Sequence, residues 1–344
     1  MKSLLAPGIA LISRVSFAKK FVLISLLFYV PLLIFSGMIV RDSVTQIRNA
    51  ELEQQGLQLS VELMKVKRLL EQQRDIRVVS NVYRKEDAQS KEREITRKAL
   101  ANIDAIVALP NPLVADAAFK QQMASLRQEV EALSSLGVNN EEGPELTFSA
   151  MNGPSTKIQA SLKYVYEQSR LTLESSKDVA GMLDLLSRSL TGLGLSSGRL
   201  RAIGSYGLTY AYLDGFTLDA LEKSLFALER FENEFPVTFE NTLQGESQVA
   251  LTPSLNSLMD DLATLRRLAD EKVVTAVSFE LSWSEYFDQV SELMDKQVAF
   301  SNGLLGHAEK IIAQKKDAEL TSTVQVVSAL VALLLITAYV YVAF

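Results

Sequence analysis

Two long apolar segments stand out in the hydrophobic pattern of the chain. The first covers residues 21–40 and the second covers residues 322–344, and neither contains a charged side chain. A helix needs roughly 20 residues, at about 1.5 Å rise each, to cross the hydrocarbon core of a bilayer. We therefore expect two transmembrane helices, with the domain between them, residues 41–321, on one side of a membrane.

The charges of the N-terminal tail predict the orientation. Residues 1–20 carry Lys2, Arg14, Lys19 and Lys20 and no acidic residue. Positively charged flanks stay in the cytoplasm, so residues 1–20 are expected to be cytoplasmic. The central domain then lies outside the cytoplasm. If the two helices cross the inner membrane of a Gram-negative bacterium, this domain is in the periplasm. A cleaved signal peptide is the alternative, but the apolar run is long for one and no A-x-A site follows it.

Apolar residues in the central domain recur with helical spacing. Leu59, Leu63, Val66 and Leu70 are separated by steps of four, three and four residues. The same steps relate two further sets: Leu183, Leu186, Leu190 and Leu193; Trp283, Phe287, Val290 and Met294. This spacing is typical of helices packed nearly parallel in bundles. No sustained alternation typical of strands is present, so we predict an all-α fold.

Prolines divide this domain, because helix interiors reject them. None occurs between Pro31 and Pro110, between Pro154 and Pro236, or after Pro253. The expected elements are a first helix to about residue 108, a turn at 109–112, a helix at about 114–135, a loop at 136–155, a long helix at 155–190, a helix at about 217–233, a loop around Pro236, a helix at about 253–270 and a last helix from about residue 273 into the second apolar segment.

Helices of this length exceed what one bundle needs. They favour two four-helix-bundle modules stacked along one axis. Glycines from Gly192 to Gly215 crowd the end of the long helix. They either break the helix or let neighbouring helices approach closely.

Composition and charge limit the classes of function that we expect for this chain. The chain has 35 basic and 41 acidic residues, a net charge of −6, and four of the basic residues lie in the N-terminal tail. An acidic central domain does not suit nucleic acid, whose backbone requires a basic surface. There is no cysteine and a single histidine, His307, in a helical stretch. We therefore expect no metal site, no cofactor and no enzymatic activity, and we expect His307 to be a surface or packing residue.

Polar residues interrupt the apolar seams at two places. The step from Leu59 reaches Gln73 and then Arg77, and a second interruption follows Leu193, where two arginines flank Leu200. A buried arginine requires a carboxylate, a backbone cage or a bound anion. Two arginine-bearing helices that face each other would bind a small planar anion such as nitrate or a carboxylate. The candidate ligand-binding residues are Gln73, Arg74, Arg77, Arg199 and Arg201.

Other roles for these side chains stay open. The arginines could instead be solvated or paired with Glu71 or Asp75. Two sets of aromatic residues could wall a pocket or pack in the core: Tyr206, Tyr210, Tyr212 and Phe216; Trp283, Tyr286 and Phe287. We expect the second set to be core.

Three short motifs accompany this layout. They are Gln72-Gln-Arg74, Leu200-Arg-Ala-Ile-Gly-Ser-Tyr-Gly207 and Trp283-Ser-Glu-Tyr-Phe-Asp288. Together they resemble the sensory half of bacterial methyl-accepting chemotaxis receptors, and the first two resemble the nitrate/nitrite-sensing type of all-helical domain. A glycine often follows the first arginine in that type, whereas this chain has Asp75 there. A two-module helical domain that binds organic acids has the same arrangement of helices.

The resemblance implies a homodimer whose first helices pair across a two-fold axis. A small-molecule ligand between the helices would shift the last helix and, through it, the second transmembrane segment. Such receptors continue into a HAMP linker and a cytoplasmic hairpin, so we expect this chain to be the sensor half of a longer protein. The alternatives are a sensor that controls a diguanylate cyclase or histidine kinase, a complete protein that signals through a partner, and a membrane-tethered structural or assembly protein.

Overall fold

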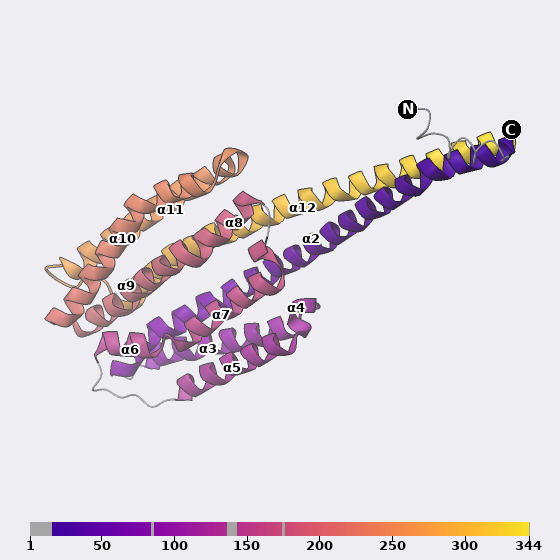
Figure 1. The fold of residues 1–344 in the computed structure, drawn as a ribbon. Coiled ribbons are helices and arrows are strands. Elements are labelled where there is room, and N and C mark those ends of the chain that lie inside the picture. The colour runs from indigo at the N-terminus through magenta and orange to yellow at the C-terminus, as the bar shows by residue number, and fades with distance from the viewer. Residues whose placement is uncertain (1–15, 84–85, 136–142, 174–175, 344) are drawn as a thin grey trace, which may run out of the picture. The chain divides into compact units, whose positions relative to one another are not determined.

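The structure is a computed structural model that describes residues 16–83, 86–135, 143–173 and 176–343. Every regular element in these ranges is helical, which confirms the predicted all-α class (Figure 1). The chain divides into two compact units. The first holds the described parts of Met1–Glu51 and Ala313–Phe344, and the second is Leu52–Ile312.

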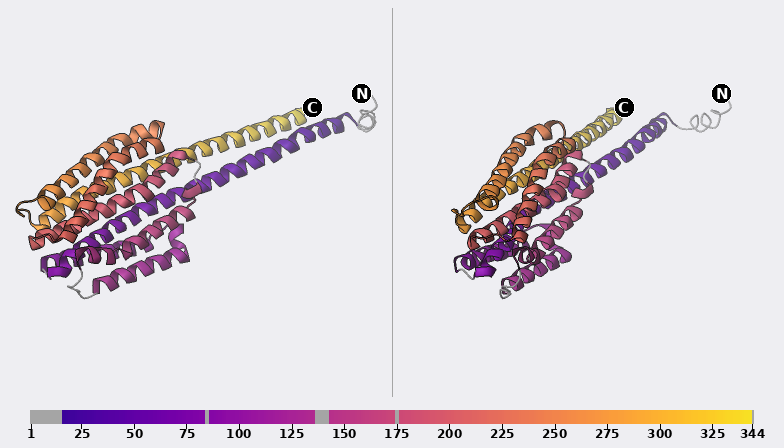
Figure 2. Two further views of the ribbon diagram at one scale, coloured as in Figure 1. Left: turned by 60° about the vertical axis from the view of Figure 1, so that its left-hand side comes forward. Right: turned by 90° about the vertical axis from the view of Figure 1, so that its left-hand side faces the viewer.

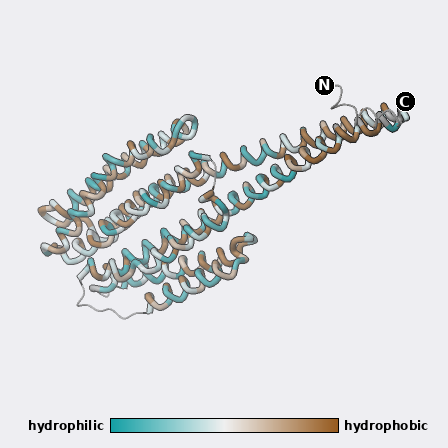
Figure 3. The backbone as a smooth tube through the Cα atoms, in the orientation of Figure 1, coloured by the Kyte–Doolittle hydropathy of each residue, from teal (hydrophilic) through white to brown (hydrophobic). Residues whose placement is uncertain are grey.

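The first unit consists of the N-terminal part of α2 (Phe17–Tyr83) and the C-terminal part of α12 (Trp283–Ala343). Both helices contain a segment long and apolar enough to cross a membrane. Their apolar side chains point outward: Leu27 is 72% exposed and Leu335 is 66% exposed. Figure 3 shows both segments as almost uniformly hydrophobic. Such surfaces are costly in water and favourable in lipid.

In the second unit, one group of helices shares a core. It contains α2, α3 (Glu86–Val107), α5 (Ala117–Ser135) and α7 (Gly153–Gln168). The seam predicted on α2 lies in this core, and Leu63 and Val66 are fully buried there against Ile103 and Phe119. Two short helices, α4 (Pro112–Ala115) and α6 (Pro144–Ala150), accompany the group. Asn111 caps α4 by accepting a hydrogen bond from the Leu113 amide.

A second group contains α9 (Leu190–Tyr210), α10 (Gly215–Thr242), α11 (Gly245–Ala269) and α12. Figures 1 and 2 show α10 and α11, in orange, side by side. Aromatic rings join α10 to α12, with 6.0 Å between the ring centroids of Phe235 and Phe300. The two other predicted seams are buried as well. The helix α8 (Lys177–Asp184) and a π-helical turn (Leu185–Ser189) lead into α9.

The first predicted helix is too long. The helix α2 ends at Tyr83 rather than near residue 108, and α3 begins at Glu86. The helix α3 runs back along α2, as shown by the hydrogen bond that Gln73 of α2 donates to Thr96 of α3. Glu86 and Asp87 give α3 an acidic first turn, which the helix dipole favours. No proline or glycine marks this reversal, so the proline-based prediction missed it.

The predicted loop at 136–155 and the helix at 155–190 also require correction. Residues 136–142 lie outside the described part, but 144–150 form α6, and α7 begins at Gly153. The expected long helix ends at Gln168, and Arg170 adopts a left-handed backbone conformation with φ 66°. A 3-10 turn (Leu171–Leu173) follows, and Ser176 caps α8 by accepting a hydrogen bond from the Val179 amide.

Three predicted boundaries near prolines and the last helix are wrong. Pro236 lies inside α10 instead of in a loop, and α11 begins well before Pro253. Buried side chains on either side, Phe235 and Phe239, hold α10 together across its missing hydrogen bond. The last helix begins at Trp283 instead of Val273. Its first turn is a capping box in which Ser282 and Glu285 accept each other's backbone amide hydrogens.

Glycines in α9 let neighbours approach closely and do not break the helix. A Cβ atom on Gly204 would lie 2.6 Å from the ring of Tyr286, and one on Gly198 would lie 2.2 Å from Nη2 of Arg74. Neither position has room for a larger residue, so α9 packs more tightly against α12 and α2 here than a side chain would permit.

Candidate ligand-binding site

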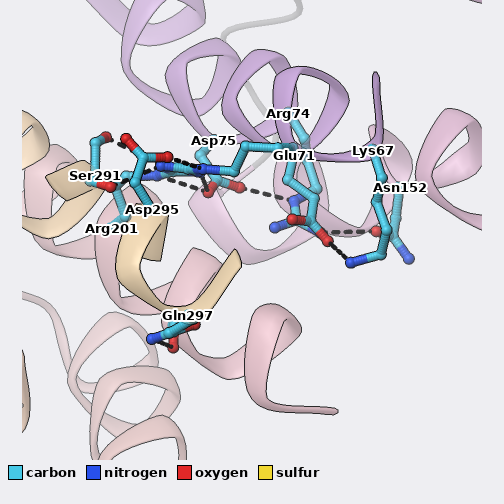
Figure 4. Close-up of polar contacts among 11 residues, drawn as sticks. Lys67, Glu71, Arg74, Asp75, Asn152, Arg201, Ser291, Asp295 and Gln297 are labelled. Carbon is cyan, nitrogen blue, oxygen red and sulfur yellow. Dashed lines mark hydrogen bonds and ion pairs between the residues drawn. The ribbon is translucent and has the colours of Figure 1, made fainter. Parts of the chain in front are cut away.

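Arg201 lies at the centre of a buried charge layer. Its side chain on α9 is fully buried. Its Nε and Nη2 donate hydrogen bonds of 2.9 Å and 2.5 Å to Oδ2 of Asp75 on α2. Its Nη1 donates one of 3.1 Å to Oγ of Ser291 on α12 (Figure 4). One guanidinium group therefore joins three helices.

Arg74 binds the other oxygen of the same carboxylate. Its Nε donates a 2.7 Å hydrogen bond to Oδ1 of Asp75, and its Nη1 donates one of 2.9 Å to Oδ1 of Asn152. The guanidinium carbon lies 4.1 Å from the ring centroid of Phe148. Two arginines thus share one planar anion, the carboxylate of Asp75. The alternative of pairing with Asp75 is therefore observed for Arg74 and Arg201, and a bound ligand anion stays a prediction.

Burial makes this layer costly unless its charges are paired. Burial lowers the pKa of Arg201, and the nearby carboxylate of Asp75 opposes that change. The Phe287 ring adds a face contact, with its centroid 5.0 Å from the guanidinium carbon of Arg201. Removing Asp75 alone would leave two buried cations without their shared partner.

The layer continues along α2 by one helical turn. Lys67 donates a 2.5 Å hydrogen bond to Oε1 of Glu71, four residues later. Burial would raise the pKa of the Glu71 carboxyl, but Lys67, Arg74 and Arg68 outweigh it and lower that pKa. Arg68 donates to Oδ1 of Asp295 on α12, at 2.6 Å, and to the backbone oxygen of Ser291, at 2.8 Å.

Positive charge exceeds negative charge in this layer. The buried cations are Lys67, Arg68, Arg74 and Arg201, and the buried carboxylates are Glu71 and Asp75. The Asp295 side chain is 62% exposed and only partly offsets Arg68. Two guanidinium nitrogens of this layer are buried and have no hydrogen-bond partner within the described residues: Nη1 of Arg68 and Nη2 of Arg74. Both are donors, so the layer can accept one further anionic or acceptor group.

The five residues predicted from the sequence do not form one pocket. Gln73 donates to Oγ1 of Thr96, and Arg77 donates to Oε1 of Glu92, so both contact α3. Arg199 forms an ion pair with Glu145, where its Nη2 lies 2.9 Å from Oε1. Only Arg74 and Arg201 come together at the layer.

Gln73, Arg74 and Arg77 do line one small cavity. Its volume is about 10 Å³. A space of that size holds about one water molecule. Nitrate is larger than water and does not fit this space, but Arg77 also lines a separate cavity of about 890 Å³ against α3.

A further cavity of about 590 Å³ adjoins the charge layer. Four residues of α2 and four of α12 line it, each set with helical spacing: Met64, Lys67, Arg68 and Glu71; Met294, Gln297, Val298 and Ser301. The other walls come from α7, the 3-10 turn, α8, the π-helical turn and α9. The cavity lies within the usual size range of small-molecule sites.

Most of the predicted aromatic residues pack against other side chains, but two are exposed. Tyr206 and Tyr210 pack together with 4.6 Å between ring centroids, whereas Tyr212 and Phe216 are exposed. None of these four lines the cavity beside the charge layer. The second aromatic set is buried, as predicted: Trp283, Tyr286 and Phe287. His307 Nε2 lies 3.3 Å from Oγ of Ser247. Within the described part of the chain, no group of three or more His, Asp and Glu residues could hold a metal ion.

Four residues of the layer were not predicted from the sequence: Lys67, Arg68, Ser291 and Asp295. A signal existed for Lys67, because Lys67 and Glu71 have the i, i+4 spacing of a helical ion pair. Lys67 and Arg68 follow directly after the seam residue Val66 and could be taken for the solvated face of α2. Arg68 contacts α12 at Asp295, which is 227 residues away in the sequence, so its burial could not be predicted locally.

No protein-family model, curated protein or solved structure matches this chain. Its function must therefore be inferred from its own residues and their contacts.

Proposed function

We propose that the chain is the sensor region of a bacterial membrane receptor of the chemotaxis type. In this proposal, α2 and α12 cross the inner membrane, and the second unit is periplasmic and binds a small anionic ligand. The two groups of helices act as two four-helix modules. Contacts between Gln58 and Glu309, and between Arg68 and Asp295, run along α2 and α12 and favour modules that lie side by side.

One observation carries the proposal. The buried layer ties α2, α9 and α12 together through Arg201, Asp75 and Ser291, and it holds more positive than negative charge. The apolar segments belong to two of these helices, α2 and α12. An anion that binds at the layer changes how α2 and α12 are held together, and can shift their equilibrium by its differential affinity for the two arrangements.

A membrane-tethered spacer is the competing function. A spacer gains nothing from buried guanidinium nitrogens without a partner, such as Nη1 of Arg68. Each of these carries a desolvation cost of about 1–3 kcal/mol. Buried polar groups without a partner are few in native proteins, and a functional role or a bound water or ion is a common explanation for them.

A hybrid receptor tests the sensor function whatever the natural output is. The chain is joined after Phe344 to the HAMP linker and signalling domain of a bacterial chemoreceptor, in cells that lack other receptors. Nitrate, formate, acetate and benzoate are added, and kinase activity is recorded. We expect at least one anion to change kinase activity in a saturable manner. A functional hybrid with no response to any of these anions would contradict the proposal.

Crosslinking tests whether α12 carries the signal. The chain has no cysteine, so introduced pairs react without interference. A short bismaleimide between Gln58→Cys and Glu309→Cys joins α2 to α12, and we expect it to suppress the response. The matched control joins Asp104→Cys to Arg127→Cys, another hydrogen-bonded surface pair, which lies between α3 and α5. The control crosslink should leave the response intact. Equal effects of both crosslinks would count against transmission through α12.

A further inference from the structure

The cavity beside the charge layer has an apolar body and a charged end. Its apolar walls include Leu162 and Tyr166 of α7, Leu183 of α8 and Leu193 of α9, together with Met294 of α12. Its buried charged end is the turn of α2 that carries Lys67, Arg68 and Glu71, whereas the other charged lining residues form two exposed ion pairs, Lys163 with Glu167 and Arg188 with Asp184. A ligand that fills this space must therefore combine apolar surface with one polar end.

The hydrogen-bonding groups at the charged end determine which polar end fits. Lys67 and Glu71 are already paired with each other. Arg68 lines the cavity and is 7% exposed, and its Nη1 is buried behind this wall with no partner within the described residues. The vacant group is thus a cationic donor, which favours an anionic acceptor. A single vacant donor group matches a monoanion better than a doubly charged phosphate.

Gly194 leaves the cavity open beside these charges. A Cβ atom there would lie 3.5 Å from Oε1 of Glu71 and 3.7 Å from Nζ of Lys67, which is ordinary van der Waals contact. A methyl group would fit, whereas a larger side chain would extend into the space that Gly194 now leaves. The glycine is therefore not required by packing at this position, unlike Gly198 and Gly204.

The cavity also touches the helices that the proposed function needs. Arg68 binds Asp295 and Ser291 of α12 through its other nitrogens. Gln297 of α12 donates a 3.0 Å hydrogen bond to Ser197 of α9 and lines the cavity as well. The π-helical turn Leu185–Ser189 forms part of the wall, and such turns are often found at functional sites. A ligand in this cavity would contact α2, α9 and α12 together.

We propose that this cavity binds a monocarboxylate with an apolar body, whose carboxylate lies at the turn of α2 that carries Lys67 and Arg68 and is attracted by their charge, and whose body lies among the leucines and Met294. This inference rests on the proposed sensor function and names its ligand class. It also excludes nitrate as the preferred ligand, because nitrate has no apolar body to fill the cavity.

Binding to the full chain in lipid nanodiscs tests the proposal, with isothermal titration calorimetry as the measurement. Benzoate is the probe. Benzyl alcohol has a similar body without the carboxylate, and nitrate has the charge without the body. We expect saturable benzoate binding at least tenfold tighter than that of either control compound. Nitrate binding as tight as benzoate binding would overturn the proposal and leave the sensor function intact.

Two variants locate the site. Gly194→Leu fills the cavity, and Arg68→Gln removes the cationic donor. We expect each to weaken benzoate binding at least tenfold. Gly192→Leu is the matched control on the same helix, because Gly192 has open space around its Cβ position and does not line the cavity. It should bind benzoate as the unmodified chain does. Helicity by circular dichroism identifies a variant that has not folded.

The possible failures are distinguishable. Equal benzoate uptake by all variants would indicate partition into the lipid and would overturn the proposal. Benzoate binding that Gly194→Leu leaves unchanged would place the ligand elsewhere and would also overturn it. If benzoate fails to bind but the hybrid receptor responds to another anion, the cavity assignment is wrong and the sensor function stands. If neither assay detects an anion, both are wrong.

Discussion

At the residue scale, Gly192 and Gly204 lie on the same helix but have opposite surroundings. Gly192 has no heavy atom within 4 Å of an added Cβ, whereas Gly204 faces the buried ring of Tyr286 at 2.6 Å. Alanine favours a helix over glycine by about 1 kcal/mol. We expect Gly192→Ala to stabilise the protein by up to about that amount.

The same substitution at Gly204 should have the opposite effect. The Tyr286 ring is fully buried and its hydroxyl donates to the backbone oxygen of Leu200, so it cannot move aside easily. We expect Gly204→Ala to destabilise the protein by about 1–3 kcal/mol, as overpacking of a core does. Thermal unfolding of both variants in detergent is the measurement. A Gly204→Ala variant as stable as Gly192→Ala would show that α9 and α12 are less tightly packed than described.

The pair of Asp75 and Arg201 permits a second test at this scale. Replacing one member of a buried ion pair leaves the other uncompensated and costs about 3–5 kcal/mol. We expect this loss of unfolding free energy in Asp75→Asn, because Arg74 and Arg201 both lose their shared carboxylate. The double variant Asp75→Asn/Arg201→Met should recover part of it, because one of the two uncompensated buried cations is then absent.

Denaturant unfolding in detergent measures both variants. Arg127→Met is the control, because the partly exposed Arg127 pairs with Asp104 at the surface and should contribute at most about 1 kcal/mol. If the double variant were no more stable than Asp75→Asn, the destabilisation would not come from the uncompensated charge of Arg201.

At the element scale, Pro236 is an unfavourable residue inside α10. It provides no N–H for the carbonyl of Glu232, four residues earlier, and proline in a helix interior costs about 3 kcal/mol. Its rigidity in the unfolded chain offsets up to about 1 kcal/mol of that cost. We therefore expect Pro236→Ala to raise the unfolding free energy by about 1–2 kcal/mol.

Pro112→Ala is the control for this prediction, because Pro112 lies in the first turn of α4, where the N–H has no helical partner. Its stability should not rise. Thermal unfolding compares the two variants. No gain from Pro236→Ala would mean that the helix is bent at this point in a way that alanine cannot repair.

The helices that could be predicted from the sequence are those whose evidence is local. The buried face of α2 could be predicted from the spacing of four residues, and the structure confirms their burial: Leu59, Leu63, Val66 and Leu70. The reversal between α2 and α3 could not be predicted in this way, because neither proline nor glycine marks it. Pro236 indicated a break that the packing of Phe235 and Phe239 overrides.

The candidate site was predictable to the same extent. Polar residues in an apolar seam singled out Arg74 and Arg201, and the structure joins them at Asp75. Their pairing across 126 residues depends on how α2 and α9 are rotated against each other. The cavity beside the charge layer arises only where several helices pack, so no single segment could indicate it. Arg77 and Arg199 were grouped with the site by spacing alone, and each pairs with a neighbouring carboxylate elsewhere.

At the scale of the whole molecule, the proposed topology has consequences for labelling in cells. The chain has no cysteine, so single introduced cysteines report the side of the membrane without background. Ala263, on α11, is exposed and belongs to the second unit. Ser3 belongs to the N-terminal tail, whose lysines and arginine favour the cytoplasm.

We expect a membrane-impermeant maleimide to react with Ala263→Cys in intact cells whose outer membrane is permeabilised. Ser3→Cys should react only after the inner membrane is lysed, because the translocon retains the basic tail and exports the long domain that follows it. The reverse pattern would place the second unit in the cytoplasm and remove the periplasmic sensor from consideration. A protein recovered in the soluble fraction would show instead that the exposed apolar faces of α2 and α12 are covered by another partner, since surfaces of that extent do not remain exposed in water.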